Sequence, residues 1–245
     1  MATHMPKSMV QVYVWQLPVR IYHWLNFIAV IVLCATGYII SNPPAINSVT
    51  EASHQYWFGK VRFIHFLTAY VFLFNFIVRL YFGFVGNRFA SWRNFIPYTR
   101  PYWREVRDVL TLDILQKRGR PMISIGHNAM AGLTYFLLFL AFAFQVVTGF
   151  GMYAAMSTSW FPQLFAWVVP FMGGDYGVRQ WHHMMMWFFI LVAIVHTYLV
   201  FYHDYVEGRG TMSSMVGGWK FIDREEYIER EETKKRASAT KRHSG

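Results

Sequence analysis

Four long apolar runs divide this chain of 245 residues, and they cover about residues 21–40, 63–84, 128–149 and 182–202. An α-helix rises about 1.5 Å per residue, so about 20 apolar residues cross the hydrocarbon core of a bilayer, which is about 30 Å thick. The pattern therefore predicts an all-α fold, an integral membrane four-helix bundle within residues 1–210. A charged tail at residues 211–245 follows it.

Helix-breaking residues lie between the runs. The sequence Asn42-Pro43-Pro44 ends the first run, because a proline ring cannot continue a helix. Pro162, Pro170 and Gly173-Gly174 interrupt the segment before the last run. Residues 102–117 mix apolar and charged positions, which indicates a helix lying at the membrane surface.

The charge distribution sets the expected orientation. The chain carries a net charge of +10, and its Lys and Arg residues concentrate at residues 88–120 and from residue 209 onward. The only Lys and Arg residues in the segments 41–62 and 151–181 are Lys60, Arg62 and Arg179. Cytoplasmic loops of membrane proteins carry such an excess, so both termini are expected to be cytoplasmic. This distribution accounts for the basicity without a nucleic-acid partner.

Two histidines in the last run are the first sign of chemistry. His182 and His196 are separated by fourteen residues, or about 21 Å along a helix, and point within about 40° of one another. Ionisable side chains inside a membrane span are costly and usually functional. The single cysteine, Cys34, cannot form an internal disulfide or an iron–sulfur site, so a metal would need other ligands.

Each of these histidines has a counterpart at the same expected depth on another helix. Alternating helix directions place His65 beside His182 near the outer surface, and His23 beside His196 near the inner surface. Two opposed imidazoles held by a helix bundle are the ligands of a bis-histidine haem. The sequence therefore predicts two haem b groups, an outer one on His65 and His182 and an inner one on His23 and His196. A hydrogen-bonded core histidine is the alternative for any one of the four.

Other ligands and metals fit less well. The step from His183 to His196 rotates about 140° around a helix, so these two residues do not share a face. His127, at the inner mouth of the third helix, competes with His23. A tetrahedral zinc site needs three or four ligands within one layer, and each layer offers two without a thiolate or carboxylate.

Two local patterns accompany the histidines. Arginines stand three residues before three of the four, a spacing that places both side chains on one helix face: Arg20, Arg62 and Arg179 precede His23, His65 and His182. They could pair with haem propionates or with lipid phosphates. In addition, Thr36-Gly37-Tyr38 ends the first helix and Thr148-Gly149-Phe150 ends the third, and both glycines give clearance for helix packing or a planar cofactor.

Five stretches carry a family resemblance: Pro18 to Leu25, Arg62 to Phe66, Phe84 to Arg88, Ile125 to Asn128, and Trp181-His182 followed by His196. Over about residues 11–220 the chain resembles the b-type cytochrome subunit of membrane-bound nickel–iron hydrogenases, a family related to formate dehydrogenase gamma subunits. The resemblance implies an anchor in the bacterial inner membrane for the periplasmic large and small hydrogenase subunits. Such a subunit takes electrons from their iron–sulfur clusters through one or two haems and passes them to quinone.

The quinone site and the competing functions stay open at this point. His127 and Asn128 lie at the expected depth of the inner haem and are candidates for quinone binding, although Asn128 could instead cap the third helix. A cytochrome of a formate dehydrogenase-like complex, a standalone b561-type reductase, and a transporter or anchor are the alternatives. The chain shows no phosphate-binding loop or nucleophile triad, which favours an electron-transfer subunit that is not catalytic by itself.

Overall fold

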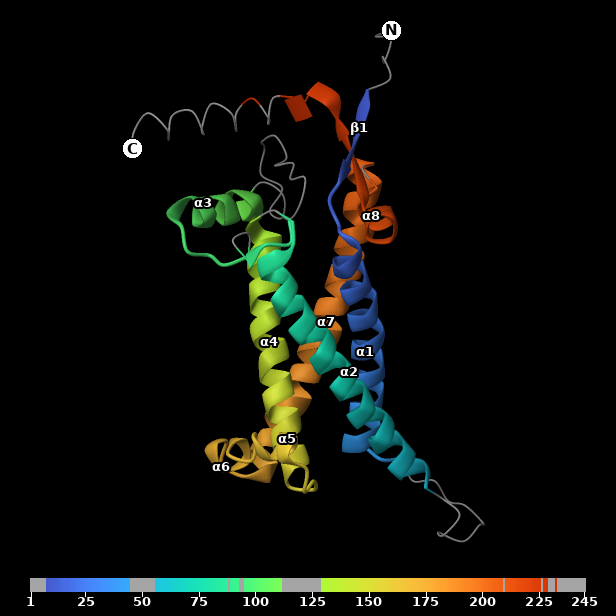
Figure 1. The fold of residues 1–245 in the computed structure, drawn as a ribbon, viewed down its shortest axis with the longest axis vertical. Helices are drawn as coiled ribbons and strands as arrows, with labels where there is room; N and C mark the ends of the chain where they lie inside the picture. The colour runs from blue at the N-terminus through green and yellow to red at the C-terminus, as the bar shows by residue number, and fades with distance from the viewer. Residues whose placement is uncertain are drawn as a thin grey trace.

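The structure is a computed structural model that describes residues 8–44, 56–87, 89–92, 95–111, 129–208, 210–225, 227–228 and 232. Four long helices form an elongated bundle (Figure 1), namely α1 (Leu17–Ser41), α2 (Trp57–Val85), α4 (Ala129–Ala154) and α7 (Asp175–Glu207). All four are long and apolar enough to cross a membrane. The predicted helical fold is confirmed, and α7 extends beyond residues 182–202 at both ends.

Short elements close the two ends of the bundle. One end, called here the terminal end, carries β1 (Met9–Tyr13), α3 (Arg100–Val109), α8 (Thr211–Gly217) and β2 (Trp219–Asp223). The opposite end, called the loop end, carries α5 (Trp160–Gln163) and α6 (Val168–Phe171). Figure 1 shows these two groups at opposite ends of the long helices. The surface helix predicted at residues 102–117 corresponds to α3, and the part after residue 111 lies outside the described residues.

Local sequence signals set the helix ends. α1 begins with Pro18 in its first turn, where backbone N–H groups have no partner within the helix, so the missing N–H of proline costs no hydrogen bond. The helix ends before Asn42. α7 lies between Gly174 and Gly208, whose φ angles of 104° and 61° favour glycine over residues with a Cβ. Thr99 caps α3 by accepting a hydrogen bond from the backbone nitrogen of Tyr102 at 3.3 Å.

Aromatic rings fill the centre of the bundle. Its buried core comes from α1, α2, α4 and α7 and includes Ala29, Phe72, Phe76, Phe139, Phe142 and Phe189. The rings of Phe142 on α4 and Phe189 on α7 stack with centroids 4.9 Å apart. Many apolar side chains face outward, among them Phe84 at 81% exposure and Ile194 at 63%. Such extensive outward apolar surface suits lipid contact.

The two ends of the described chain pair with each other. β1 and β2 form an antiparallel ladder in which Met9 pairs with Asp223 and Tyr13 with Trp219. Beside the ladder, Trp15 donates its indole N–H to the hydroxyl of Ser214 at 3.1 Å. The sequence predicts only a charged tail from residue 211 onward, whereas α8 and β2 fold back onto the first strand and the start of α1.

A buried arginine joins α2 to the segment that follows it. Arg79 is 2% exposed, and both of its terminal nitrogens donate to the carbonyl of Ala90 at 3.3 Å. Its guanidinium carbon lies 5.4–5.9 Å from the centroids of four aromatic rings, those of Tyr22, Trp92, Phe95 and Phe139. Cation–π attraction in this dry surrounding offsets part of the cost of burying the charge.

Asn87 forms a second joint at the terminal end. Its side-chain nitrogen donates to the carbonyl of Val14 at 3.0 Å, and its side-chain oxygen accepts from the backbone nitrogens of Phe89 and Ala90. Its own backbone nitrogen donates to the side chain of Gln16 at 2.8 Å. One residue thus connects the end of α2 to the start of α1.

Candidate functional site

The four predicted histidines lie on three helices in two layers. α7 carries His182 in its loop-end half and His196 in its terminal-end half, about 21 Å apart by helix rise. α2 begins at the loop end and carries His65, whereas α1 begins at the terminal end and carries His23. The directions of the helices and the positions of the histidines along them therefore give two layers, one near each end of the bundle.

The terminal-end pair consists of two rings that face each other. The ring centroids of His23 and His196 are 6.3 Å apart, and the ring planes are inclined by 56°. A metal–imidazole bond is about 2 Å long and the centroid lies roughly 1 Å behind the nitrogen, so two rings opposed across one metal are about 6 Å apart. The spacing of this pair therefore suits shared ligation of a single metal.

The loop-end pair is held by two threonines. A Cβ at Gly37 would lie 3.4 Å from the ring of His65 and 3.9 Å from the sulfur of Met186, so His65 lies beside the part of α7 that carries His182. The hydroxyl oxygen of Thr36, on α1, is 2.8 Å from Nδ1 of His65. The hydroxyl oxygen of Thr148, on α4, is 2.8 Å from Nδ1 of His182. Each loop-end histidine is thus anchored through the same ring nitrogen by a threonine from another helix.

The threonine bonds favour one tautomer of each ring. A threonine hydroxyl has one hydrogen, and Thr36 donates it to the carbonyl of Val32 at 2.6 Å. Thr148 likewise donates to the carbonyl of Phe144 at 2.8 Å. With that hydrogen given to the helix carbonyl, we assign each hydroxyl oxygen as the acceptor of Nδ1–H of the histidine. The lone pair on Nε2 of each histidine is left available for a metal.

Two glycines give the loop-end rings their space. A Cβ at Gly149 would lie 3.1 Å from Cε1 of His182, and a Cβ at Gly37 would lie 3.4 Å from Cε1 of His65. The repeated Thr-Gly pair therefore has two functions in each helix, because the threonine binds the ring and the glycine makes room for it. The sequence predicted the clearance but not the hydrogen bonds.

The neighbouring His183 has a different environment. Its Nε2 accepts a hydrogen bond from the indole nitrogen of Trp187 at 3.2 Å, and the two rings pack edge to face. That nitrogen is occupied, whereas the Thr148 contact leaves Nε2 of His182 available. The geometry favours His182 over His183 as a ligand.

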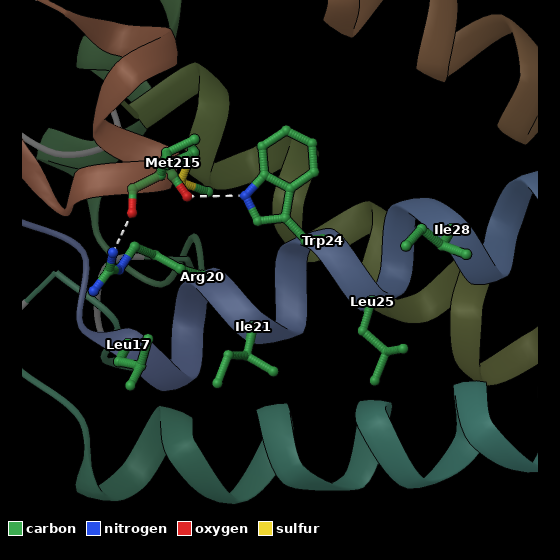
Figure 2. Close-up of a pocket in the computed structure, with 8 residues that line it drawn as sticks. Leu17, Arg20, Ile21, Trp24, Leu25, Ile28 and Met215 are labelled. Atoms are coloured by element: carbon green, nitrogen blue, oxygen red, sulfur yellow. Dashed lines mark hydrogen bonds between the residues drawn. The ribbon is translucent and has the colours of Figure 1, made fainter.

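The three arginines have protein partners. Arg20 donates to the carbonyl of Val216, and Figure 2 shows it reaching, together with Trp24, from α1 toward α8. Trp24 also packs edge-on against His23, with centroids 5.2 Å apart. The remaining two lie at the loop end, where Arg62 contacts the sulfur of Met156 and Arg179 pairs with Asp175 at 2.5 Å.

Other polar atoms around the layers are buried without a partner in the described part of the chain. Nδ1 of His23 and Nε of Arg20 are two of them at the terminal end, and Oε1 of Gln145 is a third, on α4. Gln145 donates its side-chain nitrogen to the carbonyl of His182 at 3.1 Å. The candidate quinone residues His127 and Asn128 lie outside the described residues.

The donor set fits haem. Each layer supplies two imidazoles and, within the described ranges, no cluster of three or more His, Cys, Asp or Glu side chains forms. The tautomer assigned to the loop-end rings leaves Nε2 available, and glycines replace the side chains that would crowd the rings. Two nitrogen ligands per iron in an apolar bundle are what a bis-histidine haem requires.

Comparisons with known proteins identify relatives. The sequence pattern of a family described as prokaryotic cytochrome b561 matches residues 14–218. A relative from Cupriavidus necator is 37% identical over 218 residues, which are 87% of this chain and 88% of that protein. One from Azotobacter vinelandii is 38% identical (86% and 89% covered), and one from Escherichia coli K12 is 33% identical (87% and 92% covered). The first two are named probable Ni/Fe-hydrogenase B-type cytochrome subunits, and the third is named likewise for hydrogenase 1.

Proposed function

Because the chain belongs to the prokaryotic cytochrome b561 family, we propose that it is the di-haem cytochrome subunit that anchors a nickel–iron hydrogenase to the membrane and transfers its electrons to quinone. A b-type cytochrome holds haem b, whose iron supplies one-electron redox chemistry. The names of the relatives support a hydrogenase as the electron donor.

The opposed rings of His23 and His196 are the observation that carries the proposal. Their spacing suits ligation of one iron, and α7 also carries His182, about 21 Å from His196, toward a second histidine of α2, His65. His65 and His182 would hold the second haem through Nε2. The helices around both pairs are apolar and long enough to cross a membrane, which supports an electron path within the bundle.

Charge supports an orientation with the terminal end in the cytoplasm. α3, at this end, carries Arg100, Arg104 and Arg107, whereas residues 155–174 at the loop end contain no Lys, Arg, Asp or Glu. Because cytoplasmic segments carry an excess of positive charge, this distribution supports a loop end that faces the periplasm of a bacterial inner membrane. The large and small subunits of the hydrogenase would dock at the loop end.

Quinone would accept electrons near the terminal-end pair, with His127 and Asn128 as candidates for binding its carbonyl oxygens. Arg20 and Arg62 are candidates for pairing with haem propionates, because an arginine presents two donors that match a carboxylate. Arg179 is a weaker candidate, since it already pairs with Asp175 at the protein surface.

The test is purification of the tagged chain from membranes with its partners. We expect the large and small hydrogenase subunits to co-purify and pyridine haemochrome analysis to give two haems per polypeptide. Hydrogen should then reduce both haems and added quinone. His65→Ala and His182→Ala should each remove the same haem, and His23→Ala and His196→Ala the other.

Each outcome separates one part of the proposal. A purified chain without b-type absorption bands would contradict haem binding. Haem without a hydrogenase partner would instead favour a standalone reductase. Loss of the same haem in His65→Ala and His196→Ala would contradict the assignment of the pairs.

A further inference from the structure

We propose that Thr36 and Thr148 are positioning residues that fix the tautomer of the loop-end histidines and lower the reduction potential of the haem bound there. The inference rests on the proposed function, since it requires that His65 and His182 hold haem. It concerns residues that do not touch the iron and act only through its ligands.

Burial makes these two hydrogen bonds consequential. Thr148 is 1% exposed and Thr36 is 8% exposed, so water does not compete for either hydroxyl group. Within the described part of the chain, each hydroxyl bonds to carbonyls of its own helix and to the histidine. Because the single hydroxyl hydrogen goes to the helix, the oxygen acts as an acceptor toward Nδ1–H.

The arrangement occurs twice in independent helices. α1 supplies a threonine to the histidine of α2, and α4 supplies a threonine to the histidine of α7. In both cases the following glycine lies against Cε1 of the same ring. A single contact of this kind could be incidental packing, but its repetition on both ligands of one layer indicates a specific role.

Among the described residues, no threonine binds either histidine of the terminal-end pair. Nδ1 of His23 is buried without a hydrogen-bond partner in the described part of the chain. The two layers therefore differ in the hydrogen bonding of Nδ1, the ring nitrogen that would face away from the iron.

The expected effect follows from ligand basicity. An acceptor on Nδ1–H draws the proton and increases electron density on Nε2, which strengthens the bond to the metal. The ferric state has the higher charge and gains more from a basic ligand than the ferrous state. The threonines therefore stabilise ferric iron at the loop end and lower its reduction potential relative to a ligand without an acceptor.

The experiment uses the purified holo-protein with its partner subunits. Thr148→Val and Thr36→Val keep the side-chain shape and remove the acceptor. Redox titration followed by absorbance should show an upward shift of one haem potential and an unchanged second potential. The shift should be larger in the double variant than in either single variant, and the g-values of the same low-spin haem should change in electron paramagnetic resonance spectra.

Two further variants serve as controls. Thr148→Ser keeps the hydroxyl group and should restore the potential of the unaltered protein. Thr134→Val removes a threonine on the same helix, α4, whose hydroxyl donates to the carbonyl of Met130 at 3.0 Å. It should leave both potentials unchanged, because within the described ranges this exposed threonine bonds only to its own helix.

The results decide between distinct conclusions. Unchanged potentials and g-values in Thr36→Val and Thr148→Val, with two haems bound, would overturn this inference and leave the proposed function intact. A chain without haem would contradict the proposed function itself. If the valine variants lose the haem, Thr148→Ser decides: a normal potential supports the role, and loss of haem in the serine variant as well contradicts it.

Discussion

The loop-end and terminal-end histidine pairs are built from the same residue type but are held in different ways. At the loop end, threonines fix Nδ1 of His65 and His182 at 2.8 Å, and glycines lie beside the rings. At the terminal end, His23 and His196 face each other at 6.3 Å while Nδ1 of His23 has no partner in the described residues, and His196 is exposed. The protein itself constrains the loop-end histidines, whereas it constrains the terminal-end histidines less.

This difference bears on how the two sites bind a cofactor. A ligand whose tautomer and orientation are already fixed loses little freedom on binding, whereas an unfixed ring must be ordered at that moment. At the terminal end, hydrogen bonds from Arg79 and Asn87 to backbone carbonyls hold the surrounding segments together. Its helices are well placed even though its imidazoles are less constrained.

The largest expected effect concerns haem retention. When the purified chain is exposed to a haem-binding competitor, we expect the terminal-end haem of the two proposed haems to leave first. Its affinity should be roughly tenfold or more below that of the loop-end haem, because the buried Nδ1 of His23 has no partner in the described residues. The two haems are distinguished by the His182→Ala and His196→Ala spectra. Simultaneous loss of both haems would show that the sites are equally organised.

The glycines offer a sharper test within the loop end. Gly149→Ala places a Cβ 3.1 Å from His182, which is tight, whereas Gly37→Ala places one 3.4 Å from His65, an ordinary contact. Overpacking of this kind costs about 1–3 kcal/mol, so Gly149→Ala should weaken loop-end haem binding by about tenfold. Gly37→Ala serves as the matched control. Equal haem content in both variants would contradict the tight fit assigned to Gly149.

The smallest expected effect on haem comes from Asn87→Ala. This change removes three side-chain hydrogen bonds at the terminal end and should lower the free energy of unfolding by about 1–3 kcal/mol. Thermal unfolding in detergent measures the change, and loop-end haem content should stay the same. A loss of loop-end haem comparable to that in His182→Ala would show that the two ends are not independent.

The sequence predicted those parts of the molecule that depend on local geometry. Helix rise and rotation relate His182 to His196, and the opposed rings of His23 and His196 lie together as expected from their depth. The Thr-Gly repeat was recognisable as clearance. The role of the threonines was not, because it depends on the direction of the hydroxyl hydrogen, which only the carbonyls of Val32 and Phe144 determine.

Features that join distant segments were missed. Arg79 lies within an apolar run, and nothing nearby in sequence indicates that Trp92, Phe95 and Phe139 surround it. The pairing of β1 with β2 was missed for the same reason, since each strand has only five residues and its partner is far away. The positions of His127 and Asn128 stay a prediction.

The ladder between Met9 and Asp223 has a consequence for biogenesis. Its strands are separated by more than two hundred residues, so a ribosome must synthesise most of the chain before the first strand can find its partner. Until then β1 presents an open strand edge, which other chains can bind. Pairing of the two strands is therefore a late step in assembly, and it can occur only after all four long helices have been made.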